Sequence, residues 1–253
     1  MANPRSAFPQ TGFTSTKSPT DMITHDNHWI AFDAAGTLFE PAEPVENIYA
    51  DCFSTLGFGI PESTWKAAFG KAYLITPDPI FPEDGDGDAI EKEWWHEMVR
   101  RAAEAAGIRP DPVTMTDAFE EIFEHYSAGA AWKLFPEVDA VLASLKAKGI
   151  SLAITSNYDS RLHRVVKELG IAQHFDLILT SAEARARKPA PLILEKLFAD
   201  TGANPATTCL AGDSLTCDKG SAEAAGIPFY HIDRPATDLS SFEIWHTETF
   251  FQK

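Results

Sequence analysis

Short apolar runs that alternate with segments of helical periodicity dominate the sequence. The runs are "HWIAFD" (28–33), "SLAITS" (151–156), "DLILT" (176–180), "TCLAG" (208–212) and "PFYHI" (228–232). Between them, apolar residues recur at i, i+3, i+4 and i+7, as in Val138, Val141, Leu142 and Leu145. Strands that alternate with helices form a parallel sheet with helices on both faces. The sequence therefore predicts an α/β fold built on a parallel sheet.

Residues 42–134 break this alternation. Four stretches carry helical periodicity and no strand pattern, namely "PVENIYADCFSTLG", "ESTWKAAFGKAYL", "AIEKEWWHEMVRRAAEAAG" and "MTDAFEEIFEHYSAG". Residues 40–134 also hold 19 acidic against 7 basic residues, most of the formal net charge of -16. We expect a separate helical domain over 42–134, inserted after the first strand, and a core made of 28–41 and 135–253.

Composition excludes several classes of function. A chain this acidic lacks the basic face that a nucleic acid or an anionic membrane would require. Residues 1–27 are rich in Ser, Thr, Pro and Asn, which predicts a disordered tail, with a transit peptide as the less favoured interpretation. The three cysteines, Cys52, Cys209 and Cys217, lack the spacing of a disulfide framework, so we expect a reduced, cytoplasmic setting. Nothing in the sequence predicts an oligomeric state.

Polar residues follow the predicted strands at the points where the strands end. Asp33 follows the first strand, Ser156 and Asn157 close the second, Lys188 lies after the third, and the fourth leads into "AGDSLTCD" with Asp213 and Asp218. The carboxyl ends of parallel strands meet at one edge of the sheet, where catalytic loops lie. Carboxylate oxygens bind divalent cations, and a lysine, a hydroxyl and loop amides bind phosphate. One carboxylate remains available as a nucleophile.

At these same positions the sequence resembles the haloacid dehalogenase superfamily, over about residues 28–235. "FDAAGTLF", "AITSN", "SAEARARKP" and "AGDSLTCD" are similar to its four motifs, in the same order. "PVENIYADCFSTLGFGIPESTWKAAFGKAY", "KEWWHEMV" and "ITSNYDSRL" resemble the branch of haloacid dehalogenase-like hydrolase domain-containing proteins that includes the rhythmically expressed gene product of flies. The resemblance implies a Rossmann-like core, a helical cap after the first motif, and Mg²⁺-dependent hydrolysis through an aspartyl intermediate.

The resemblance also implies roles for individual residues around the metal. Asp33 would be the nucleophile and a metal ligand. The backbone carbonyl of Ala35 would be a second ligand, Asp213 a third, and Asp218 would support the ion directly or through water.

Other residues would contact the substrate, a small phosphorylated molecule. Thr37 and Ser156 would hold the phosphoryl oxygens, and Asn157 would border the pocket. Lys188 would neutralise negative charge on Asp33 and on the transferring group.

The sequence departs from the family pattern at Ala35. Phosphatases of this superfamily usually carry an aspartate two residues after the nucleophile, which protonates the leaving oxygen and then activates water. A methyl group cannot do this, and general acid–base catalysis is worth roughly 10² to 10⁴ in rate. The electrostatic contributions of the metal and the lysine remain. We therefore expect a phosphatase that lacks the usual acid.

Three alternatives stay open. A metal-bound ligand-binding or regulatory module could have kept the site and lost turnover. Enzymes that hydrolyse phosphonoacetaldehyde also carry alanine at this position and use a cap lysine, for which Lys66, Lys71 and Lys92 are candidates, although solvated helix lysines are the better interpretation. A 2-haloacid dehalogenase would use Asp33 but would not need the metal pair Asp213 and Asp218.

Several further features carry less information. "DGDGD" (84–88) suggests a calcium loop, but Ala89 and Trp95 occupy the positions of its glycine and its glutamate, so a solvated loop is expected. His96 and His125 have no paired ligand at i+4. In the third motif, Arg185 replaces a frequent glycine and Ala190 a common aspartate.

Overall fold

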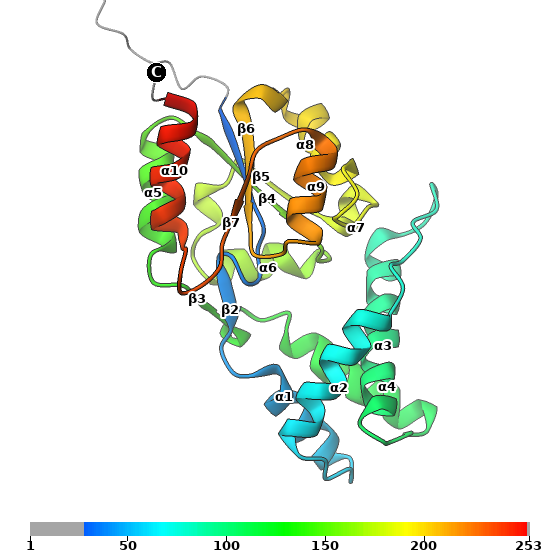
Figure 1. The fold of residues 1–253 in the computed structure, drawn as a ribbon. Helices are drawn as coiled ribbons and strands as arrows, with labels where there is room; N and C mark the ends of the chain where they lie inside the picture. The colour runs from blue at the N-terminus through cyan, green and yellow to red at the C-terminus, as the bar shows by residue number, and fades with distance from the viewer. Residues whose placement is uncertain (1–27, 252–253) are drawn as a thin grey trace, which may run out of the picture.

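The computed structural model describes residues 28–251 and contains a five-stranded sheet in the order β5-β4-β1-β6-β7 (Figure 1). The strands are β1 (Trp29–Phe32), β4 (Ser151–Ser156), β5 (Leu177–Thr180), β6 (Thr208–Gly212) and β7 (Phe229–His231), and all neighbouring pairs are parallel. Each of the five predicted strands is confirmed within one or two residues of its expected ends. All five are short. The three central strands β4, β1 and β6 are buried, as apolar runs between two helical layers should be, and the edge strands β5 and β7 are partly exposed.

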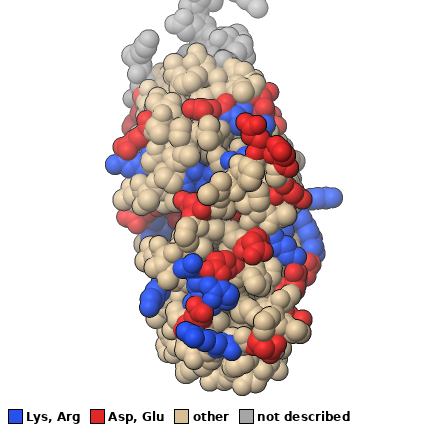
Figure 2. All heavy atoms as spheres, turned by 90° about the vertical axis from the view of Figure 1, so that its right-hand side faces the viewer, with Lys and Arg blue, Asp and Glu red and all other residues tan. Residues whose placement is uncertain are grey.

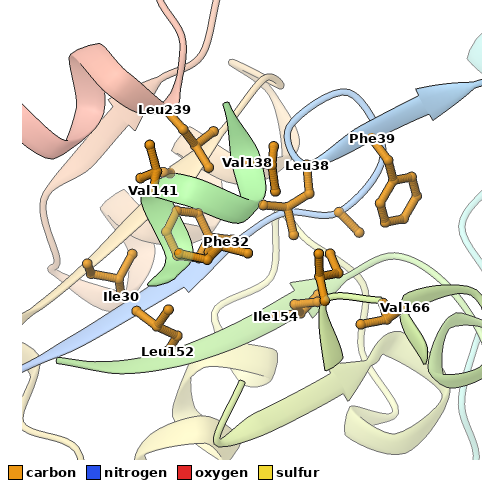
Figure 3. Packing of buried hydrophobic residues seen from close by; sticks show 14 of the residues in the cluster. Ile30, Phe32, Leu38, Phe39, Val138, Val141, Leu152, Ile154, Val166 and Leu239 are labelled. Carbon is orange, nitrogen blue, oxygen red and sulfur yellow. The ribbon is translucent and has the colours of Figure 1, made fainter. Parts of the chain in front are cut away.

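Helices cover both faces of the sheet. Helices α5 (Val138–Ala147), α6 (Arg161–Glu168) and α10 (Leu239–Phe251) lie on one face, and α8 (Leu192–Thr201) and α9 (Cys217–Ala225) lie on the other. Side chains of β1 alternate between the two layers. Ile30 and Phe32 pack into the first layer (Figure 3), and Trp29 and Ala31 pack into the second. Burying an Ile or Phe side chain of this kind stabilises the fold by about 1.5–3 kcal/mol.

Short elements complete the core. These are α7 (Ser181–Ala184) and the 3₁₀ turns η1 (Gly129–Ala131), η2 (Ala172–His174) and η3 (Pro205–Thr207). Helix α7 begins at a capping box formed by Thr180 and Glu183 and ends at Arg185, which adopts a left-handed conformation with φ 54°.

The helical insertion forms a cap with a hydrophobic core of its own. Its helices are α1 (Val45–Thr55), α2 (Glu62–Ile75), α3 (Gly87–Ala105) and α4 (Pro112–His125), which lie below the sheet in Figure 1. Phe53 and Trp65 stack with ring centroids 4.7 Å apart at the centre of this cluster. The side chains of Asp86 and Asp111 cap the amino ends of α3 and α4. The expected α/β fold with a helical cap is confirmed.

Two short antiparallel strands join the cap to the core. Strand β2 (Phe39–Pro41) pairs with β3 (Trp132–Leu134) at the two points where the chain enters and leaves the cap. Three residues are too few to show a periodic pattern, so neither strand was predicted. The boundaries proposed at 41/42 and 134/135 stay predictions, and the tail predicted over 1–27 lies outside the described residues.

The surface carries charges of both signs. On the face shown in Figure 2, acidic and basic side chains are interspersed. Within residues 28–251, no helix combines the length and the apolar character that crossing a bilayer requires. Cys52, Cys209 and Cys217 are free thiols.

Candidate functional site

Three carboxylates meet at the carboxyl edge of the sheet, where the sequence predicts them. Asp33 directly follows β1, and its backbone N–H donates to the carbonyl of Ala211 in β6 at 2.9 Å. Asp213 and Asp218 follow β6. One oxygen from each carboxylate lies within 4.8 Å of the others. Such a set of hard oxygen donors fits a divalent cation such as Mg²⁺.

Lys188 lies between two of these carboxylates. Its Nζ donates to Asp33 Oδ1 at 2.6 Å, to Asp218 Oδ1 at 2.5 Å and to the Thr155 carbonyl at 2.8 Å. All three ammonium hydrogens are therefore used, and the side chain is almost completely buried. Burial opposes the charge, but the carboxylates of Asp218 and Asp33 outweigh it and raise the pKa of Lys188 above its usual range.

The environment of Asp33 differs from that of an ordinary surface carboxylate. Burial raises the pKa of Asp33 to about 7; Lys188 opposes the shift, and repulsion from Asp218 and Asp213 adds to it. Desolvation likewise raises the pKa of Asp213, and the charge of Asp218 contributes. A group of carboxylates that repel one another is a site that a cation would stabilise.

Two glycines make room for this cluster. Gly36 has φ +92°, and a Cβ added there would overlap the carboxylate of Asp213. A Cβ on Gly212 would overlap the carboxylate of Asp218, whose Oδ2 accepts from the backbone N–H of Ser214 at 2.9 Å. The backbone therefore approaches both acids more closely than any side chain would allow.

The side-chain amide of Asn157 forms two hydrogen bonds with the backbone of Lys188. Its Oδ1 accepts from the backbone N–H of Lys188 at 2.7 Å, and its Nδ2 donates to the carbonyl of Lys188 at 2.8 Å. This pair of bonds fixes the backbone that carries the ammonium group. Asn157 was expected to border the pocket, and in the structure it holds the lysine in place.

The two predicted hydroxyls lie at buried positions. Ser156 ends β4 with 4% exposure, and Thr37 is fully buried with no hydrogen-bond partner for its Oγ1. Ala35 is partly exposed and forms an isolated bridge with Phe39. Its methyl group carries no ionisable proton, as the sequence indicates.

The cap contributes contacts that sequence reasoning missed. Glu91 of α3 is fully buried and forms an ion pair with Arg187, the residue before Lys188. Arg185 donates to the cap carbonyls of Pro82, Glu83 and Gly85. Arg185 itself adopts a left-handed conformation with φ 54°, which a glycine would adopt with less strain.

Tyr73, at the end of α2, is a second residue that the sequence did not single out. It is 46% exposed, and its ring lies edge-on to that of Trp94 at 6.0 Å. Burial of part of the side chain raises the pKa of Tyr73; Cys217 adds to this shift, and Arg187 opposes it. Tyr73 is therefore a partly exposed cap side chain on which the charges of Asp33 and Lys188 act.

The other candidate residues make contacts within the cap or between the cap and the core. Lys66 Nζ lies 3.2 Å from Glu46 Oε1, and Lys92 Nζ lies 2.8 Å from Glu120 Oε1, so both amines have carboxylate partners within the cap. Lys71 is exposed. The rings of His96 and His125 pack on Phe119 and Tyr126. The acids of 84–88 are exposed, as expected, but Asp86 caps α3 and Asp88 Oδ1 accepts from the N–H of Ser160 in the core at 2.8 Å. This loop is therefore part of the contact between cap and core.

An aromatic cavity of about 90 Å³ lies where the cap meets the core. Rings from the cap line it together with Tyr158 and Arg161, which follow β4. Arg161 is held over the ring of Phe123 at 3.4 Å and by an ion pair with Asp159 at 2.7 Å.

Comparison with known proteins agrees with this geometry. A model of the family described as "haloacid dehalogenase-like hydrolase" matches residues 28–226. Haloacid dehalogenase-like hydrolase domain-containing protein 3 of Mus musculus is 29% identical over 199 residues, which cover 78% of either chain. A phosphoglycolate phosphatase of Thiobacillus denitrificans is 33% identical over 208 residues, which cover 78% of this chain and 89% of its own.

A solved structure shows the same fold. The crystal structure of the HAD-hydrolase YfnB from Bacillus subtilis, bound to magnesium and described as revealing interdomain movement, superimposes with a TM-score of 0.63 at 15% identity. The match covers 83% of this chain and 91% of that one.

Proposed function

Because the chain belongs to the haloacid dehalogenase-like hydrolase family, we propose that it is a Mg²⁺-dependent phosphatase that acts on a small phosphorylated metabolite. The observation that carries this proposal is the placement of Lys188 Nζ 2.6 Å from Asp33 Oδ1, beside three clustered carboxylates. The arrangement provides a nucleophile, a fixed cation and the ligands for a second, exchangeable cation. Transfer of a phosphoryl group requires these same components.

Asp33 acts first. The oxygen of its carboxylate that Lys188 does not hold attacks phosphorus, a P–O bond to Asp33 forms, and the ester P–O bond breaks as the alcohol oxygen leaves with the electron pair. Water then cleaves the aspartyl phosphate, and inorganic phosphate departs. Lys188 neutralises charge that develops on the transferring group and on Asp33. Asp33, Asp213, Asp218 and the Ala35 carbonyl would hold Mg²⁺, which supplies further electrostatic stabilisation of the phosphoryl oxygens.

The substrate contacts in this proposal come from the core. Ser156 and Thr37 bind phosphoryl oxygens, and the buried, unpartnered hydroxyl of Thr37 supports a polar ligand next to it. Asn157 keeps Lys188 in position. The acid that Ala35 lacks is replaced by the substrate itself or by a leaving group that needs no proton.

The surrounding observations favour this proposal over the alternatives. A dehalogenase would not require the second and third carboxylates, whereas a metal-assisted phosphatase does. Lys66 and Lys92 pair with cap carboxylates and Lys71 is exposed, which favours solvated helix lysines over a Schiff-base lysine. A pure binding module would not need a buried nucleophile held against an ammonium group. The charge of the chain and its unpaired thiols support a cytoplasmic enzyme without nucleic-acid or membrane partners.

Hydrolysis of an aryl phosphate tests the proposal. The protein should release phosphate when Mg²⁺ is present, and EDTA should stop the reaction. Asp33→Asn should abolish turnover while circular dichroism shows a folded protein, because an amide cannot attack phosphorus. Activity of the variant within about tenfold of the wild type would remove Asp33 from the role of nucleophile. A screen of phosphorylated metabolites would then identify the substrate.

A further inference from the structure

A buried ion pair links the cap to the loop that carries the catalytic lysine. Arg187 Nε donates to Glu91 Oε1 at 3.0 Å, and Arg187 Nη2 donates to Glu91 Oε2. Ser181 Oγ donates to the same Oε1 at 2.6 Å. Glu91 has no exposed surface and Arg187 is 7% exposed. The forked geometry fixes the guanidinium in position and in orientation.

The ring of Trp94 also contacts the guanidinium of Arg187. Trp94 lies one helical turn after Glu91 on α3, and the Arg187 guanidinium stacks over its ring at 3.6 Å. The Trp94 Nε1 in turn donates to the carbonyl of Pro77 at 2.8 Å. One face of α3 therefore holds Arg187 by a carboxylate and by an aromatic ring.

Only one peptide bond separates this pair from the catalytic site. Lys188 follows Arg187, and its own backbone is clamped by Asn157. A shift of Arg187 therefore changes the position from which the Lys188 side chain reaches Asp33 and Asp218. Among the described residues, the cap is thus tied directly to the backbone that places the ammonium group.

Stability alone does not account for the pair. Removing two charges from water is costly, and apolar side chains of similar volume often stabilise a protein as well or better. The other polar contacts between this part of the cap and the core, such as Asp88 with the N–H of Ser160, lie near solvent. A need to hold Arg187, and with it the backbone of Lys188, in a fixed position explains a buried and oriented ion pair at this point.

We propose that Glu91 is a positioning residue: through Arg187 it places Lys188 between Asp33 and Asp218 when α3 of the cap lies against α7. Docking of the cap and placement of the catalytic lysine are then one event. The proposal rests on the phosphatase function proposed above, because it assigns a cap residue to the same lysine. Since Lys188 acts on charge that develops in the transition state, loss of Glu91 should lower kcat more than it raises KM.

Four variants test the proposal. Glu91→Gln keeps the shape of the side chain and removes its charge. Arg187→Met removes the guanidinium that forms both hydrogen bonds with Glu91. The double variant Glu91→Met/Arg187→Met replaces the pair by apolar side chains. Asp88→Asn is the matched control, because it weakens another contact between cap and core that does not touch Arg187.

Kinetics on an aryl phosphate give the first measurement. Glu91→Gln should lower kcat by up to about 10²-fold with KM changed by less than about threefold, since misplacing a catalytic group by 1 Å can cost this much. The melting temperature of the double variant should equal or exceed that of Glu91→Gln, while its kcat should remain low. Recovery of kcat together with stability, or an equal loss in Asp88→Asn, would overturn the proposal.

Chemical labelling gives a second measurement that needs no turnover. Lys188 is buried, whereas Lys219 is exposed and serves as an internal reference. With limiting acetic anhydride and mass spectrometry, Lys188 should be protected in the wild type and in Asp88→Asn, and should label about tenfold faster in Glu91→Gln. Unchanged protection in Glu91→Gln would overturn the positioning role. An inactive wild type in which the labelling still changes would overturn only the phosphatase assignment.

Discussion

Gly36 lies so close to Asp213 that a single added carbon atom at Gly36 would overlap the Asp213 carboxylate. The glycine also has φ +92°, a conformation that L-residues rarely adopt. Gly36 thus meets two requirements: it allows a left-handed turn after β1, and it leaves space for the carboxylate of Asp213, a proposed metal ligand. This relationship explains why the small-residue stretch after Asp33 ends in glycine.

Gly36→Ala should therefore weaken Mg²⁺ binding. The added methyl group forces Asp213 away from Asp33, and we expect the Mg²⁺ concentration for half-maximal stabilisation to rise by about tenfold or more. Thermal denaturation over a Mg²⁺ titration measures this change. Gly57→Ala is the matched control, because Gly57 has φ +91° with no atom within 4 Å of an added Cβ. Both variants should lose about 1–2 kcal/mol to backbone strain, and only Gly36→Ala should lose affinity for the ion.

Asp213→Asn tests directly whether the Asp213 carboxylate binds Mg²⁺. Asp213 is exposed, so the amide should be tolerated by the fold, but the site loses one of its few formal charges. The Mg²⁺ requirement for both stabilisation and turnover should rise by about tenfold or more. Asp233→Asn, at an exposed acid of the next loop, should leave the titration unchanged. An unchanged titration in Asp213→Asn would show that the metal has been placed wrongly.

Much of this site could be predicted because its residues follow strands. The apolar runs that precede Asp33, Ser156 and Asp213 locate the strand ends, and the parallel topology brings those ends together. The predicted convergence of Asp33, Lys188, Asp213 and Asp218 is a direct consequence of that order.

The contact between cap and core could not be predicted in the same way. Glu91 and Arg187 are 96 positions apart, and a pairing over that distance has no local pattern. One signal was available: Glu91 shares a helical face with Trp94 and Met98, which pack into the cap. An acid on an apolar face requires a buried partner, but the sequence does not say which residue that partner is.

The raised pKa of Asp33 predicts how the stability of the metal-free protein depends on pH. The folded-state pKa is about 7 against an ordinary value of 3.8, because the carboxyl is buried. Between these two pH values the folded protein retains a proton that the unfolded chain releases, so the contribution of Asp33 to stability falls as pH rises through this window. In EDTA, the melting temperature of Asp33→Asn minus that of the wild type should therefore increase from pH 4 to pH 7.

A control separates this local effect from the loss of one negative charge in an acidic protein. Asp200→Asn removes the same unit of charge at an exposed site on α8, where Asp200 pairs with Lys196 at 3.0 Å. Its melting-temperature difference should stay nearly constant over the same pH range. If Asp33→Asn behaves like Asp200→Asn, the carboxyl of Asp33 is not the group that burial perturbs.

Ala35 leads to a prediction about leaving groups. A site that cannot protonate the departing oxygen should favour substrates whose oxygen leaves as a weak base. The wild-type rate should therefore depend steeply on the leaving-group pKa, with acyl and aryl phosphates far ahead of sugar phosphates. Ala35→Asp should flatten this dependence and accelerate alkyl phosphates by up to about 10², if the new carboxylate reaches the leaving oxygen. Rates measured over a series of phosphate esters give the slope for each protein.

Ala35→Asn is the matched control for that experiment, because it adds the same bulk and polarity without a transferable proton. It should leave the slope steep. Ala35 is partly exposed and packs against the hydrophobic core, so Asp and Asn at this position are compared at a similar cost in packing. A flat dependence in the wild type, with fast hydrolysis of alkyl phosphates, would mean that another group already supplies the proton. Tyr73, which is 46% exposed at the end of α2, would then be the first residue to replace by phenylalanine, ahead of His96 and His125, whose rings pack on cap side chains.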